Sequence, residues 1–161
     1  MMPERVVLHA DMDQFFVACE IREQPELAGK PVVVGADPKG GKGRGVVSTC
    51  SYPARKFGVK SGMPISTAFR LCPKCVFLPL NPELYLRRSA EVMEILRKFA
   101  VKFEQWGIDE AFLEVTGKIA NFMEAENLAQ EIKQEVKSKT GLTCSIGIGP
   151  NKLVAKIASD Q

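Results

Sequence analysis

Seven residues, Trp106-Gly107-Ile108-Asp109-Glu110-Ala111-Phe112, decide the fold of this chain because they place two adjacent carboxylates at the tip of a predicted β-hairpin. Aromatic and branched residues lead into and out of this tip, which is typical of strands. Asp is also an ordinary turn residue, so a solvated hairpin turn is the alternative interpretation. A third carboxylate brought to the same place would favour a functional site instead.

The N-terminus supplies a third carboxylate. The run Val6-Val7-Leu8-His9-Ala10-Asp11-Met12-Asp13 is typical of a buried strand that ends in acid. If this strand end lies beside the hairpin tip, Asp11 meets Asp109 and Glu110, and the three acids would raise one another's pKa values unless divalent cations compensate. Carboxylates suit Mg²⁺, and ions about 4 Å apart can stabilise both the attacking and the leaving oxygen of an in-line displacement.

Composition predicts an ordinary globular domain, or a small domain with an insertion: the chain has 161 residues, 45% hydrophobic and 25% charged. No apolar run reaches the roughly 20 residues of a membrane helix and no signal-peptide pattern is present, which favours a cytoplasmic location. Five scattered cysteines favour reduced, buried thiols over disulfides or zinc.

The net charge of +3 does not indicate nucleic-acid binding by itself. The basic residues clustered within 39–60 are equally consistent with an anion-facing surface and with a solvated surface.

Periodicity and turn residues predict the other elements. Asp13 is expected to cap a short helix, in preference to binding metal. Residues 82–100 form an amphipathic pattern, and a second long helix is expected to end at Gly141. The stretch 143–149 is expected as a strand with one nearly bare face, after which Asn151 caps a last helix.

Without residues 14–79, the predicted order is strand, helix, two-stranded hairpin, helix, strand. This is the ferredoxin-like βαββαβ plan, so the predicted fold class is α+β with a small, mostly polar and basic insertion after the first strand. The plan is expected to place the first strand beside the hairpin strand that leads to Asp109. Asp11 would then meet Asp109 and Glu110, as a shared metal site requires.

Two pairs of side chains indicate a phosphorylated ligand. Tyr52 and Arg55 stand three apart on a short predicted helix and therefore share a face, which brings a phenol and a guanidinium together. Lys152 and Lys156 lie on one side of the last predicted helix, where DNA or phosphate contact is favoured by the helix N-terminus. The Tyr52 and Arg55 pair alone is a weak signal.

Motifs in order along the chain carry a family resemblance: DMDQFF at 11–16, YPARKFGVKSGM at 52–63, IDEAF at 108–112 and GIGPNKLVAKIASD at 147–160. With them the chain resembles Y-family translesion DNA polymerases, specifically the DNA polymerase IV branch. The resemblance implies a palm subdomain at 1–13 and 80–161 and a fingers subdomain at 14–79, with the thumb and little-finger domains absent from this chain. It also implies error-prone, two-metal transfer of deoxynucleotides to a primer 3′-hydroxyl.

The resemblance also implies roles for residues in these motifs. Asp11 and Asp109 would bind both Mg²⁺ ions, Glu110 would ligate the ion that activates the 3′-hydroxyl, and the Met12 carbonyl would complete a coordination sphere. The incoming triphosphate would be held by Tyr52 and Arg55, with help from Thr49 and the amides near Phe15, and Phe16 would be the steric gate that guards the sugar. Primer-template DNA, dNTP and a sliding clamp bound through the absent C-terminal region are the implied partners of a monomer.

Two alternatives from other classes stay open. A ferredoxin-like nucleotide cyclase also uses an acidic hairpin and two Mg²⁺ ions, but its signature has Gly-Gly before the acids, where this chain has Gly107-Ile108. A non-enzymatic RNA-binding module predicts aromatic residues exposed on the sheet strands, whereas the last strand carries Thr143, Ser145 and Gly147.

Overall fold

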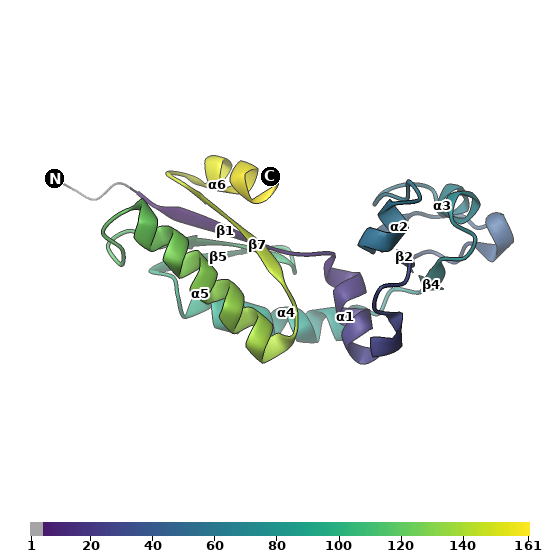
Figure 1. Ribbon diagram of the computed structural model, residues 1–161, viewed down its shortest axis with the longest axis horizontal. Helices are drawn as coiled ribbons and strands as arrows, with labels where there is room; N and C mark the ends of the chain where they lie inside the picture. Colours follow the sequence, from purple (N-terminus) through teal and green to yellow (C-terminus); the bar gives the residue numbers. More distant parts are fainter. Residues whose placement is uncertain (1–4) are drawn as a thin grey trace. The chain divides into compact units, whose positions relative to one another are not determined.

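A computed structural model describes residues 5–161, which form two compact units (Figure 1). The first comprises the chain up to Asp13 together with Leu86–Gln161, and the second comprises Gln14–Tyr85. The predicted insertion ends at residue 79, whereas the second unit continues to Tyr85. This difference has a packing reason, because the Tyr85 ring stacks on Phe16 and its hydroxyl donates to Glu20.

The first unit is a four-stranded antiparallel sheet with helices on both faces. Its strand order is β5-β6-β1-β7, formed by β1 (Val7–Met12), β5 (Lys102–Trp106), β6 (Glu110–Glu114) and β7 (Cys144–Gly149). In Figure 1, α5 (Phe122–Thr140) and α4 (Pro82–Arg97, from Leu86 onward in this unit) lie on one side of the sheet, and α6 (Lys152–Ser159) lies on the other, against β7 and β1. This is the ferredoxin-like order, so the predicted α+β fold is confirmed.

The central position of β1 corrects one expectation. β1 pairs with β6, which leaves the hairpin turn, and not with β5, which leads into it. β5 is mostly exposed at the sheet edge, whereas the middle of β6 is buried, so the more apolar strand takes the inner position. The register sets Asp11 opposite Glu110 and His9 opposite Phe112.

Asp13 does not cap a helix, so that prediction is wrong. The residue before α1 (Phe15–Glu23) is Gln14, in the left-handed conformation with φ 36° and without a side-chain capping bond. The Asp13 carboxylate instead accepts hydrogen bonds from the hydroxyls of Thr143 (2.8 Å) and Ser145 (2.7 Å). It therefore fastens the chain after β1 to the beginning of β7.

The second unit is built on a three-stranded sheet of order β3-β2-β4. Its elements after α1 are η1 (Pro25–Leu27), β2 (Val32–Gly35), η2 (Lys39–Gly41), β3 (Val47–Cys50), α2 (Tyr52–Arg55), α3 (Ile65–Leu71) and β4 (Val76–Leu78). Aliphatic side chains and thiols form its core, including Val33, Cys50, Ile65, Cys72 and Cys75. All five cysteines are buried and free, as predicted. Within residues 5–161, no helix has the length and apolar character needed to span a membrane.

Gly147 explains why one face of β7 carries such small side chains. A Cβ at this position would lie 2.1 Å from the Ala155 carbonyl oxygen and 2.2 Å from the Ser159 amide nitrogen. Both atoms belong to the α6 backbone, which cannot yield as a flexible side chain can. The nearly bare face predicted for this strand is therefore the surface on which α6 lies.

We predict that Gly147→Ala destabilises the fold by about 3 kcal/mol, because overpacking against backbone forces α6 to shift. Gly117→Ala is the control: it meets nothing within 4 Å, but its φ of +86° strains an L-residue, at about 1 kcal/mol. Chemical denaturation would measure both. Equal losses would show that α6 accommodates the added methyl group.

Candidate functional site

The sheet register brings the predicted metal ligands together. Asp11 lies opposite Glu110 in the β1–β6 pair, and Asp109 directly precedes Glu110. The Met12 amide donates to the Asp109 carbonyl oxygen (2.9 Å), which continues the ladder beyond the Asp11–Glu110 pair. Three carboxylates thus converge where β1 ends and β6 begins, as the sequence predicts.

Two of these acids are electrostatically unfavourable as anions. Burial raises the pKa of Asp11 to about 7, and the negative charges of Glu110 and Asp109 add to this shift. Burial, followed by the charge of Glu110, also raises the pKa of Asp109. Like charges directly opposite each other destabilise a sheet, so this site favours an added cation.

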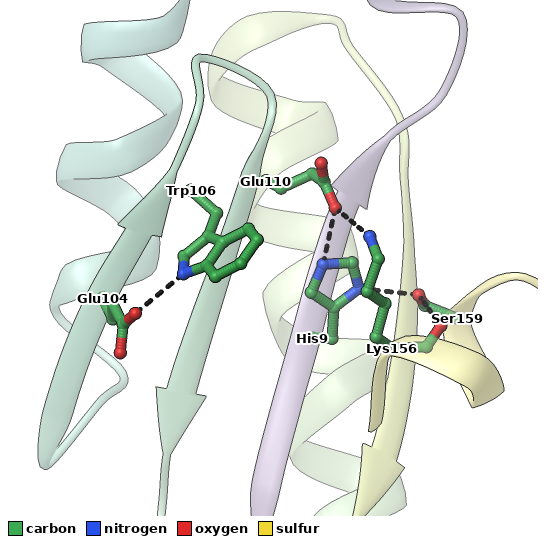
Figure 2. Close-up of polar contacts among 6 residues, drawn as sticks. All are labelled: His9, Glu104, Trp106, Glu110, Lys156 and Ser159. Carbon is green, nitrogen blue, oxygen red and sulfur yellow. Dashed lines mark hydrogen bonds and ion pairs between the residues drawn. The ribbon is translucent and has the colours of Figure 1, made fainter. Parts of the chain in front are cut away.

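Glu110 has internal donors instead. Its Oε1 accepts hydrogen bonds from Lys156 Nζ (2.6 Å) and His9 Nε2 (2.9 Å), as Figure 2 shows. Burial alone would raise the pKa of Glu110, but the hydrogen bonds and charges of Lys156 and His9 hold it below its usual value. Glu110 is therefore the more readily ionised of the two carboxyl groups, and Asp11 is the more readily protonated.

His9 is a residue whose role the sequence analysis missed. Its side chain is fully buried, its Nδ1 lies 2.6 Å from Ser159 Oγ, and burial lowers the pKa of the ring. The available signal was a lone polar residue inside the apolar run of β1. Ser159, on α6, gave no comparable signal.

The donor set fits a divalent cation that arrives with a phosphorylated ligand. Among the residues from 5 to 161, no three His, Cys, Asp or Glu side chains form a ready-made metal centre. Mg²⁺, however, is usually held by one or two carboxylates together with substrate phosphates. Asp11 and Asp109 supply two such carboxylates, and Glu110 lies beside them on the neighbouring strand.

The second unit presents the predicted triphosphate ligands on α2 and β3. The Arg55 guanidinium lies 5.0 Å from the centre of the Tyr52 ring, and both side chains are exposed, as their spacing predicts. The Tyr52 amide donates to Gln14 Oε1 (3.0 Å). Thr49 is half-buried on β3, and Phe15 is buried in α1. The surface of α2 is thus open to an anion.

Phe16 is held by a buried pair that the sequence analysis did not single out. Its ring stacks on Tyr85 with centroids 4.3 Å apart and planes 12° apart. The Tyr85 hydroxyl donates to Glu20 Oε1 (2.7 Å), and burial raises the pKa of that phenol. Phe16 itself is half-buried, so part of the ring is accessible.

The two predicted lysines of α6 both contact carboxylates of the sheet. Lys156 bonds Glu110, whereas Lys152 forms an exposed ion pair with Glu104 of β5. Glu104 Oε1 also accepts a hydrogen bond from Trp106 Nε1 (2.7 Å; Figure 2). Contact of these lysines with DNA or phosphate stays a prediction.

We predict that Asp11→Asn stabilises the metal-free chain at pH 8 and not at pH 3.5. The folded-state pKa of Asp11 lies above the unfolded value, so its unfavourable contribution is absent below the unfolded pKa and complete above the folded one, near 7. Allowing for solvent screening, the gain at pH 8 is on the order of 1–2 kcal/mol. Denaturation at both pH values tests this, with Glu114→Gln at the far end of β6 as control. A gain independent of pH would contradict the electrostatic origin.

Comparison with known proteins shows the family to which the chain belongs. Residues 10–160 match the impB/mucB/samB family. DNA polymerase IV 2 of Methanosarcina mazei is 60% identical over 155 residues, covering 96% of this chain and 42% of the relative. DNA polymerase IV of Lactococcus lactis subsp. cremoris is 45% identical, covering 97% and 43%.

Solved structures agree with these matches. The insertion ternary complex of Dbh DNA polymerase is 41% identical with a TM-score of 0.90, covering 96% of this chain and 45% of that one. DinB from Sulfolobus solfataricus is also 41% identical, with a TM-score of 0.88 and the same coverage. The chain thus spans less than half the length of the relatives it matches.

Proposed function

We propose that this chain, which belongs to the impB/mucB/samB family of Y-family DNA polymerases, forms the catalytic and nucleotide-binding part of a translesion polymerase of the DNA polymerase IV branch. One observation carries the proposal: Asp11, Asp109 and Glu110 converge at the ends of β1 and β6. The family matches give no support to a nucleotide cyclase. The relatives are DNA polymerases IV, which supports a polymerase.

The proposed reaction is nucleotidyl transfer. The primer 3′-hydroxyl loses its proton to solvent and its oxygen attacks the α-phosphorus of a dNTP. A new P–O ester bond forms as the bond from the α-phosphorus to the α,β-bridging oxygen breaks, and pyrophosphate leaves. Y-family polymerases use divalent metal ions, and two bound Mg²⁺ ions would stabilise the attacking and leaving oxygens. Asp11 and Asp109 would hold both ions, with Glu110 and the Met12 carbonyl completing the ligand set. The raised pKa values of Asp11 and Asp109 support this assignment, because a cation would offset the charge.

The nucleotide would be bound by exposed donors of the second unit. Tyr52 and Arg55 offer a phenol and a guanidinium on one helix face, which suits phosphate oxygens. Thr49 and the backbone near Phe15 would assist, and Lys152 and Lys156 would contact DNA or phosphate.

Primer-template DNA and dNTP are the proposed partners. The relative of known structure described as a ternary complex supports them. The proposal also includes a sliding clamp bound outside this chain, a monomeric polymerase and a cytoplasmic location.

A chimera tests the function directly. Residues 1–161 would replace the matching segment of the Methanosarcina mazei relative, which supplies the remaining length. We expect template-directed, Mg²⁺-dependent primer extension and no cyclisation of GTP. A folded chimera that cyclises GTP, or that cannot extend a matched primer, would refute the proposal.

We predict that Asp11→Ala, Asp109→Ala and Glu110→Ala each lower the extension rate of the chimera at least about a thousandfold, because each removes a ligand from the centre that stabilises the transition state. Folding should persist, since like charges are removed. Glu114→Ala, at the other end of β6, is the matched control. Single-turnover extension and circular dichroism measure both effects, and near-normal extension by any of the three would remove that residue from the metal site.

We predict that Phe16→Ala raises ribonucleotide incorporation far more than it changes deoxynucleotide incorporation. The flat ring stacked on Tyr85 would occupy the space of a ribose 2′-hydroxyl, so a steric cost falls on the wrong sugar alone. The kcat/KM values for dCTP and CTP opposite template guanine measure the ratio in the chimera. Phe15→Ala is the neighbouring control. An unchanged ratio of the dCTP and CTP values in Phe16→Ala would contradict the steric-gate assignment.

A further inference from the structure

One oxygen of Glu110 receives both of its internal hydrogen bonds. Lys156 and His9 both contact Oε1, whereas Oε2 accepts no side-chain hydrogen bond from residues 5–161. In Figure 2 this second oxygen points away from His9. Asp11, the residue of β1 that pairs with Glu110, lies on the neighbouring strand. Internal hydrogen bonds therefore hold Oε1 of the carboxylate and leave Oε2 available to a ligand.

The hydrogen atoms around His9 allow a clear assignment for a neutral ring. Ser159 Oγ lies within bonding distance of His9 Nδ1 (2.6 Å) and of the Lys156 carbonyl oxygen (2.8 Å), but it has one proton to donate. If Nδ1 carried the ring proton, the bare Nε2 lone pair would face the Glu110 anion at 2.9 Å. An attractive contact requires Nε2–H, so Ser159 donates to Nδ1.

We propose that His9 is a positioning residue for Glu110, and that Ser159 fixes the His9 tautomer that makes this possible. Nε2–H of His9 holds Oε1, and Oε2 is presented to the divalent cation. The inference rests on the proposed function, in which Glu110 is a metal ligand. Hydrogen-bonded supports of metal ligands commonly change metal affinity 10- to 100-fold when removed.

The architecture supports this role because the support is rigid. His9 is fully buried, and its ring lies 4.7 Å from that of Phe112 on β6. Ser159 is brought to it by α6, whose backbone approaches β7 at Gly147. Lys156 is the weaker constraint, because its long side chain is 42% exposed. The buried imidazole thus sets the direction of the carboxylate more firmly than the lysine does.

Two substitutions separate positioning from packing. His9→Phe keeps a buried aromatic ring beside Phe112 but removes both hydrogen bonds. His9→Gln loses the ring but retains an amide N–H near the place of Nε2. We measure Mn²⁺ affinity on this chain with dCTP present, as the loss of the EPR signal of free Mn²⁺ beyond that caused by dCTP alone. We expect this affinity to fall about tenfold or more for His9→Phe and to recover largely for His9→Gln. Thermal stability should rank the other way, with Phe above Gln.

Ser159→Ala tests the tautomer. It removes the donor to Nδ1 and should lower Mn²⁺ affinity by less than His9→Phe does. Ser138→Ala is the matched control, because the Ser138 hydroxyl, like that of Ser159, lies within bonding distance of the carbonyl three residues earlier in a helix, but it is on the exposed part of α5. We expect its Mn²⁺ affinity to equal that of the unchanged chain.

The outcomes distinguish this inference from the proposed function. If Asp11→Asn abolishes Mn²⁺ binding while His9→Phe leaves it unchanged, the metal site stands and the positioning role fails. If His9→Gln binds Mn²⁺ no better than His9→Phe, the ring acts through packing and the inference is overturned. If the unchanged chain binds no Mn²⁺, or binds it equally well as Asp11→Asn, the proposed metal site itself fails.

Discussion

The repulsion between Asp11 and Glu110, set opposite each other by the β1–β6 register, is the constraint on which the rest of the site depends. β1 is a central strand, so water cannot fully screen these charges, and burial raises the pKa of Asp11 to about 7. The protein's own side chains stabilise only one of these two anions. Glu110 receives Lys156 and His9, whereas Asp11 and Asp109 keep raised pKa values. An added cation therefore stabilises the site where the protein itself does not.

The glycines of β7 are what allow α6 to take part. Gly147 and Gly149 both lie against the α6 backbone, where any Cβ would collide. This close approach brings Lys156 and Ser159 over the sheet, onto the face that carries His9 and Glu110. A larger residue would lift the helix and withdraw both donors together. Packing of a helix on a sheet thus sets the electrostatics of a carboxylate on a different strand.

The pattern of neighbouring residues was sufficient to predict most helices and strands and the position of the three acids. Buried strands, the apolar faces of helices and caps such as Asn151 depend on residues close in sequence. This pattern failed where the deciding partner is remote. Asp13 looks like an N-cap until Thr143, 130 residues away, donates to it. Likewise, His9 acquires its role from Ser159, 150 residues later. The inner place of β6 depends on the burial of the whole sheet, which no single strand pattern reveals.

The same construction recurs in the second unit with different chemistry. Phe16 is partly accessible, yet its orientation is fixed from behind by Tyr85, and Tyr85 is fixed in turn by the buried carboxyl of Glu20. In the first unit, Glu110 is partly accessible and is held by His9, which Ser159 holds. An aromatic ring proposed to exclude a hydroxyl and a carboxylate proposed to bind a cation both need a defined direction. Each obtains it from a buried, hydrogen-bonded neighbour, so the rigidity of the proposed site lies one layer beneath the groups that would touch the substrate.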